Sequence, residues 1–109
     1  MKMEENFNKL TPAETERLVL LAEELAESIQ AVGKILRHGW NVIDPNTGIK
    51  YYNRFDLEKE LAQAQFALSL MLINGDLNQD NIANHFSDKA STIQQYLHHN
   101  SVPEEMLNI

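Results

Sequence analysis

The sequence contains no cysteine among its 109 residues, and only three prolines, four glycines and one tryptophan. Without cysteine the chain has no disulfide framework, no thiolate ligands for zinc and no cysteine nucleophile. Basic residues are also few, since nine lysines and arginines stand against sixteen acidic residues and leave a formal net charge of −7. This charge balance argues against a general affinity for nucleic acid phosphates or for anionic membranes.

Long apolar runs are missing as well. No segment approaches the roughly 20 apolar residues of a membrane-spanning helix, and the N-terminal stretch MKMEENFNKL lacks the apolar core of a signal peptide. We therefore expect a cytoplasmic protein. The sequence has no Gly-rich phosphate loop and no nucleophile elbow, so it fits neither a P-loop enzyme nor a serine hydrolase. The four histidines lack the helical spacing of a two-histidine metal site.

What the sequence does contain is a clear pattern of helices. A capping box formed by Thr11, Pro12 and Glu14 predicts the start of a helix over about 11–38, and Gly39 should end it. Apolar residues recur along this helix in steps of three and four, which predicts one buried stripe: Leu18, Leu21, Leu25, Ile29, Val32 and Leu36.

The second half of the chain is also expected to be helical. Asn53 as N-cap predicts a helix over about 54–73, and an apolar stripe of the same kind predicts a third over about 78–98. The segment between Trp40 and Tyr52 is rich in turn-forming residues, so we predict a loop there and no strand anywhere in the chain.

These patterns predict a single all-α domain over residues 1–109. Its core would be an antiparallel helical bundle, with residues 1–10 and 100–109 peripheral to it. A domain of this length lies near the lower end for a self-sufficient core, and three amphipathic helices leave apolar surface uncovered. We therefore expect oligomerisation to complete the bundle.

Two pairs of polar residues stand out in the helical pattern, one of two acids and one of an acid and an amide. Glu24 and Glu27 are three residues apart on the first helix, and Glu60 stands three residues before Gln63 on the second. Residues at this spacing project from one side of a helix, and small or apolar residues flank both pairs along the axis. Facing pairs would offer an oxygen-rich site to a hard divalent cation, although acidic pairs of this kind are usually solvated surface.

The segments that hold these acids resemble a known family. The runs ETERLVLLAEELAESIQAVGKILRHGW, NRFDLEKELAQAQFAL and DKASTIQQYLHHN resemble MazG-like members of the all-α nucleoside triphosphate pyrophosphohydrolase superfamily, particularly the short phage or mobile-element type. The family signature is an EExxE box followed by an ExxD box. Glu23, Glu24 and Glu27 match the first box, and Glu60 begins the second, where Gln63 replaces the aspartate.

The resemblance implies an enzyme that assembles as a homodimer or a dimer of dimers and hydrolyses a nucleoside triphosphate to a monophosphate and pyrophosphate. It implies that Glu23, Glu24 and Glu27 are the catalytic acids. It further implies that Mg²⁺, or Mn²⁺ as a substitute, is held by four side chains: Glu24, Glu27, Glu60 and Gln63. An amide can offer a neutral oxygen but neither charge nor a basic site, so Gln63 should weaken both metal binding and water activation.

Substrate binding is expected to depend on basic and aromatic side chains. Phosphate oxygens would be bound by Lys89, with Lys34, Arg37 and Arg54 as further candidates, and Trp40 could stack on a nucleobase. For Lys89 a solvated surface position is an equal alternative, and for Trp40 packing of the loop onto the bundle is the more common role.

Two functions therefore remain open at the level of sequence. The first is a magnesium-dependent nucleotide pyrophosphohydrolase whose activity Gln63 would lower. The second is a catalytically impaired relative that binds a nucleotide or a protein partner through the same bundle. Gln63 is the residue on which the choice depends.

Overall fold

The computed structural model describes residues 7–107, and its elements are almost all helical. The predicted segments 1–10 and 100–109 lie partly outside the described residues. The chain divides into two units, Met1–Asp76 and Leu77–Ile109, which we describe separately. Within the described residues, no helix combines the length and the apolar composition needed to cross a bilayer.

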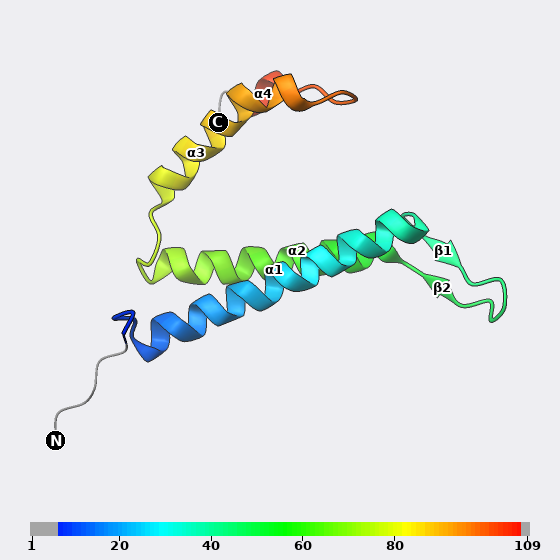
Figure 1. The fold of residues 1–109 in the computed structure, drawn as a ribbon, viewed down its shortest axis with the longest axis horizontal. Coiled ribbons are helices and arrows are strands. Elements are labelled where there is room, and N and C mark those ends of the chain that lie inside the picture. The colour runs from blue at the N-terminus through cyan, green and yellow to red at the C-terminus, as the bar shows by residue number, and fades with distance from the viewer. Residues whose placement is uncertain (1–6, 108–109) are drawn as a thin grey trace. The chain divides into compact units, whose positions relative to one another are not determined.

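The first unit is a pair of long helices joined by a short hairpin (Figure 1). Helix α1 covers Pro12–His38 and helix α2 covers Asn53–Ile73, and the two pack side by side in antiparallel directions. The capping box at the start of α1 is present: the Thr11 hydroxyl accepts a hydrogen bond from the backbone N–H of Glu14, whose carboxylate accepts one from Thr11 N. At the other end, the N–H of Gly39 donates to Ile35 O.

The segment between the helices corrects the prediction of a loop without strands. Strands β1 (Val42–Ile43) and β2 (Lys50–Tyr51) pair in antiparallel register, with Val42 opposite Tyr51. The connecting residues contain the expected turn chemistry, since the Asp44 carboxylate accepts a hydrogen bond from Asn46 N at 2.8 Å and Gly48 has a φ of 73°. Two residues per strand are too few to give a readable alternation in sequence.

Asn53 was expected to cap α2 and does not. Tyr52 holds the cap position without a side-chain hydrogen bond, and Asn53 is the first helical residue. Its side chain is 1% exposed, and Nδ2 donates to the carbonyl of Gly39 at 3.0 Å. Because the N–H of Arg54 also donates to Trp40 O at 2.9 Å, the start of α2 is tied directly to the end of α1.

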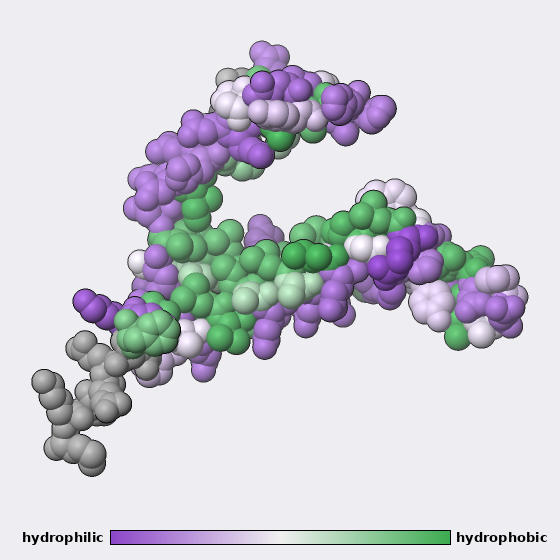
Figure 2. Space-filling model, in the orientation of Figure 1, coloured by the Kyte–Doolittle hydropathy of each residue, from purple (hydrophilic) through white to green (hydrophobic). Residues whose placement is uncertain are grey.

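Few side chains are fully buried where α1 meets α2, and most of these are small or polar. Among the described residues of this unit, the buried side chains are Ser28 on α1 and Asn53, Ala64, Ala67 and Met71 on α2. The predicted stripe of large apolar residues is instead mostly exposed: Leu18, Leu25, Ile29, Val32 and Leu36. Apolar surface extends over the long helices in the space-filling view (Figure 2). The line of closest approach therefore runs along a different side of α1 from the stripe that periodicity selected.

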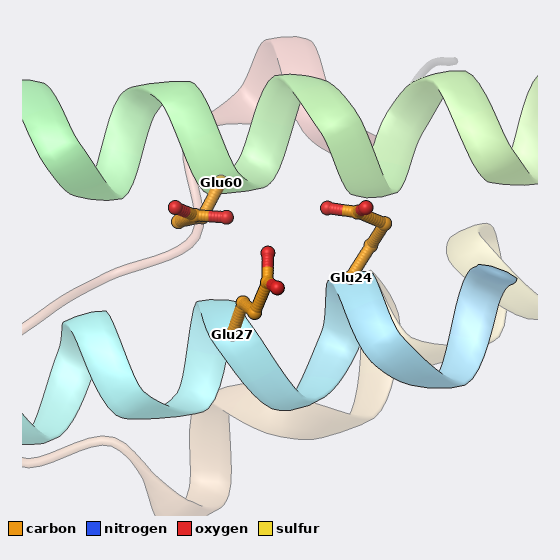
Figure 3. A group of neighbouring side chains, drawn as sticks. All are labelled: Glu24, Glu27 and Glu60. Atoms are coloured by element: carbon orange, nitrogen blue, oxygen red, sulfur yellow. The ribbon is translucent and has the colours of Figure 1, made fainter.

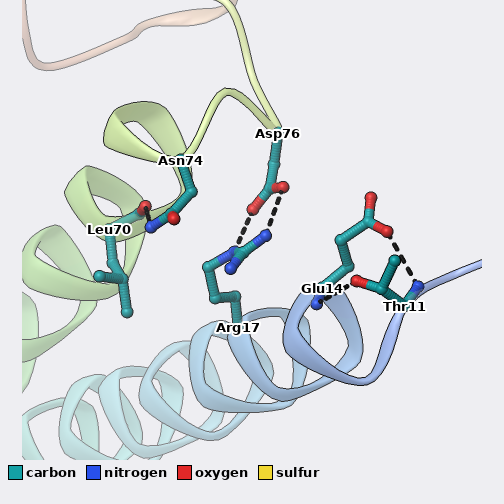
Figure 4. Close-up of polar contacts among 6 residues, drawn as sticks. All are labelled: Thr11, Glu14, Arg17, Leu70, Asn74 and Asp76. Carbon is teal, nitrogen blue, oxygen red and sulfur yellow. Dashed lines mark hydrogen bonds and ion pairs between the residues drawn. The ribbon is translucent and has the colours of Figure 1, made fainter.

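A bidentate ion pair closes the end of the helix pair away from the hairpin. Arg17 on α1 donates from Nε to Asp76 Oδ2 at 2.6 Å and from Nη2 to Oδ1 at 2.9 Å (Figure 4). Asp76 directly follows the turn that ends α2, in which Gly75 has a φ of 80°. The guanidinium lowers the pKa of Asp76, so this pair stabilises the fold while the carboxylate is ionised.

The second unit consists of shorter helices. Helix α3 covers Gln79–Thr92 and is capped by the Asn78 side chain, the 3₁₀-helix η1 covers Ile93–Tyr96, and α4 covers Glu104–Leu107. The predicted helix over 78–98 is therefore shorter than expected. The hydroxyls of Ser91 and Thr92 donate to carbonyls of the preceding turn, a local bonding pattern that weakens a helix.

Candidate functional site

Three carboxylates converge between α1 and α2. Glu24 and Glu27 extend from α1, and Glu60 extends from α2 toward them (Figure 3). One oxygen from each residue lies within 4.8 Å of the others. Glu24 and Glu60 are half-buried and Glu27 is exposed, so the group opens to solvent on one side. The spacing of three residues on α1 aims both of its acids at α2, as the sequence indicated.

Gln63 completes this group from α2. When its amide nitrogen faces the carboxylates, as their acceptor oxygens require, Nε2 donates to Glu24 Oε2 at 3.1 Å and to Glu60 Oε2 at 3.3 Å. The amide thus links one acid of each helix. The structure brings together all four residues that the family resemblance implies as metal ligands: Glu24, Glu27, Glu60 and Gln63.

The proximity of these acids affects their protonation. A side-chain hydrogen bond with Glu60 raises the pKa of Glu27 above its usual range, and the negative charges of Glu24 and Glu60 raise it further. Glu23 contributes least to this shift. Since Glu23 is exposed and is not one of the three converging acids, its predicted catalytic role has no geometric support in the described residues.

A polar groove of about 700 Å³ extends from the acids along the helix pair. Glu27 and Glu60 line it at the acidic cluster, and three basic side chains line it as well: Lys34, Arg37 and Lys59. Lys34 and Arg37 lie on the same side of α1 as Glu27, seven and ten residues further along, which corresponds to about 10 and 15 Å of helix. The groove therefore combines an acidic cluster with a basic stretch beside it.

The other predicted substrate-binding residues lie elsewhere. The guanidinium of Arg54 packs over the ring of Trp40 at 4.5 Å from its centroid, so these two residues bind each other beside the hairpin. This contact supports the more common role of Trp40, which is to pack the connecting segment onto the helices. Lys89 is exposed on α3 in the second unit, and its proposed phosphate contact stays a prediction.

Several groove residues were missed in the sequence. Asn53, Asp56 and Lys59 line the groove on α2, and Gln30 lines it on α1. A signal for part of this set was available, because Asn53, Asp56, Glu60 and Gln63 follow one another in steps of three and four. Such a row marks one polar side of a helix, but it does not reveal which partner faces it.

Comparison with known proteins gives no further guidance. No protein-family model, no curated protein and no solved structure matches this chain. The resemblance to MazG-like proteins therefore rests on the sequence alone.

Proposed function

We propose that this protein is a magnesium-dependent nucleoside triphosphate pyrophosphohydrolase that acts in the groove between α1 and α2. The observation that carries the proposal is the convergence of Glu24, Glu27 and Glu60, from two helices, at a groove that also holds basic side chains. A nucleotide with its bound cation presents the complementary charges, a metal for the acids and phosphate oxygens for the lysines and arginine.

The donor set suits a hard cation. Carboxylate oxygens are the preferred ligands of Mg²⁺ and Mn²⁺, and a mutual separation within 4.8 Å is compatible with three oxygens around one ion after small side-chain movements. Glu24, Glu27 and Glu60 would hold the ion, and Gln63 could add its carbonyl oxygen after turning its amide. A bound cation would screen the phosphate charge and polarise the phosphorus centre.

The residues of this chain would supply the remaining chemistry. Lys34, Arg37 and Lys59 would bind the phosphate oxygens and hold the triphosphate along the groove. Water would attack the α-phosphorus, the bond to the departing pyrophosphate would break, and the proton of the water would pass to a carboxylate. Glu27 is the best candidate for that base, through the oxygen that does not face the ion, because it is the exposed member of the cluster and lines the groove.

One observation favours a second candidate, the catalytically impaired relative. The Gln63 amide already satisfies one oxygen of Glu24 and one of Glu60, so it takes up part of the role that a cation would have. An aspartate there would instead add a fourth negative charge and a stronger ligand. The two candidates therefore differ in how well the natural site binds Mg²⁺.

Pyrophosphate release from a panel of ribo- and deoxyribonucleoside triphosphates, measured with Mg²⁺, would test both candidates. We expect activity in the natural chain that disappears in Glu24→Ala and Glu60→Ala and increases in Gln63→Asp. Activity only in Gln63→Asp would identify the impaired relative. If neither the natural chain nor Gln63→Asp releases pyrophosphate from any nucleotide, the pyrophosphohydrolase proposal is wrong.

Association into a homodimer or dimer of dimers is the second part of the proposal. It is supported by the exposed row of large apolar side chains on α1, of which Ile29 is 72% and Leu36 81% exposed. Contiguous apolar surface of this kind commonly marks an interface. Light scattering at micromolar concentration tests it, and a monomer there would contradict it.

A further inference from the structure

A second cavity lies between the hairpin and the end of α1. It has a volume of about 390 Å³ and is lined largely by apolar surface, including Val42, Pro45 and the ring of Tyr51. Two residues, Lys34 and Asn53, line both this cavity and the polar groove, so the two spaces adjoin each other. A charged groove thus continues into a largely apolar pocket whose wall includes the Tyr51 ring. Two polar residues also line this pocket: His38 and Asp44.

We propose that this hairpin pocket binds the base and sugar of a nucleotide whose phosphates lie in the polar groove, with Tyr51 as the stacking surface. The inference rests on the proposed function, because it assumes that the ligand is a nucleotide. A nucleotide has the matching construction, a charged phosphate chain joined through a sugar to a flat ring whose faces are apolar. Pockets of a few hundred Å³ with a few polar groups are typical of such ligands.

Lys34 stands at the junction of the two spaces. Its Nζ lies 6.0 Å from the centroid of the Tyr51 ring, a loose contact that leaves the ammonium free to turn toward a phosphate. Lys34 is seven residues, or about 10 Å of helix, beyond Glu27. A nucleotide whose α-phosphate lies at the acids would therefore extend its sugar and base past Lys34 toward the hairpin pocket.

Asn53 provides a polar group at the same junction. Its Nδ2 is bound to Gly39 O, which fixes the orientation of the amide, and its Oδ1 is buried without a hydrogen bond from the described residues. A buried acceptor without a donor is costly. The oxygen is shielded from solvent, so an N–H group of a base would satisfy it only after a small movement of the Asn53 side chain. Every common base has such a group, so this contact would not select among them.

Binding of nucleoside 5′-monophosphates in EDTA tests the pocket separately from hydrolysis. Adenosine, guanosine, cytidine and uridine monophosphates would be titrated by calorimetry into the natural chain and three variants. We expect Tyr51→Leu to weaken binding of the preferred monophosphate about tenfold, from loss of base stacking. Tyr51→Phe should retain the affinity. Tyr52→Leu is the matched control, since Tyr52 is the adjacent exposed tyrosine and does not line the pocket.

Inorganic triphosphate, which has no base, provides the comparison within the site. Its binding should be unchanged in Tyr51→Leu and weakened in Lys34→Gln. The pocket assignment is overturned if no monophosphate binds, or if Tyr51→Leu binds monophosphates as tightly as the natural chain does. If binding depends on Tyr51 but the chain releases no pyrophosphate, the pocket assignment stands and the proposed enzymatic activity is wrong. If pyrophosphate is released and Tyr51→Leu does not affect the release, the enzymatic activity stands and the pocket assignment is wrong.

Discussion

The two long helices have an inner and an outer face of opposite character. The inner face, where α1 meets α2, contains small side chains and three acids, whereas the outer face contains large apolar residues in contact with solvent. Acids at a helix contact and isoleucines in water both cost free energy if nothing else binds there. This contrast supports our proposal that each face serves a partner, a cation with its nucleotide inside and a second copy outside.

Truncation of the inner core should have the largest effect on stability. Met71 is 3% exposed, so Met71→Ala should lower the free energy of unfolding by about 2–5 kcal/mol, measured by urea denaturation. The loss should be the same at every protein concentration if Met71 belongs to the core of one chain. Ile73→Ala is the control on the same helix, because Ile73 is 84% exposed. An equal loss in both variants would contradict the distinction between the two faces.

A charge on the outer face should abolish association. Ile29→Glu places a carboxylate in the middle of the exposed apolar row of α1, and burying it in an interface would be costly. Light scattering should show a dimer or tetramer for the natural chain and a monomer for this variant. Helical content should be retained in circular dichroism.

The matched control for that experiment is Val19→Glu. Val19 is also exposed on α1, but it lies about 80° around the helix from Ile29 and about 120° from Leu25. It should leave the assembly intact. If both variants dissociate, or if neither does, the outer face is not the interface.

Periodicity predicted the helices better than it predicted their contacts. The bounds of α1 followed from local chemistry at Thr11 and Gly39, which the sequence displays directly. The side of α1 that contacts α2 could not be predicted in this way. The two helices meet at small residues such as Ala64 and Ala67, whereas large apolar residues such as Leu25 lie on the exposed side. A strong apolar stripe indicates burial somewhere, and in an oligomer that place can be another chain.

In the candidate site, too, local features could be predicted from the sequence and tertiary contacts could not. Glu24, Glu27 and Glu60 were found because three-residue spacing and the resemblance pointed to the same positions. The hairpin pocket was not found, since it depends on how Asn53 is buried against Gly39 rather than on any spacing. Contacts between residues far apart in sequence, which depend on tertiary packing, were the part that could not be predicted.

The ion pair between Arg17 and Asp76 closes one end of the helix pair and, unlike the acidic cluster, joins groups of opposite charge. Arg17→Ala should lower the melting temperature at neutral pH, because it leaves a half-buried carboxylate without its two donors. The folded-state pKa of Asp76 is lowered, so the stabilisation is present above its ordinary pKa and is lost as the pH falls through the lowered value. The natural chain and the variant should therefore converge in acid.

Lys59→Ala is the comparison for that pair. Lys59 Nζ lies 3.7 Å from Glu60 Oε1, but its side chain is 54% exposed, and exposed pairs contribute little. Its melting temperature should stay close to that of the natural chain. A larger loss in Lys59→Ala than in Arg17→Ala would reverse our ranking of the two contacts.

The smallest effect on stability should come from the acidic cluster, in which carboxylates of like charge lie close together. The folded-state pKa of Glu27 is raised, so its contribution to stability is complete below the ordinary value of 4.5 and is lost as the pH rises through the raised pKa. Glu27→Gln, which cannot ionise, should remove this loss and raise the melting temperature slightly at neutral pH without metal. Glu23→Gln should do so less, since Glu23 is the weakest cause of the shift. Adding Mg²⁺ should then raise the melting temperature of the natural chain more than that of Glu27→Gln. Only the natural chain has three acids at the cluster whose mutual repulsion the cation relieves. Equal stabilisation of both proteins would show that the cation does not bind at this cluster.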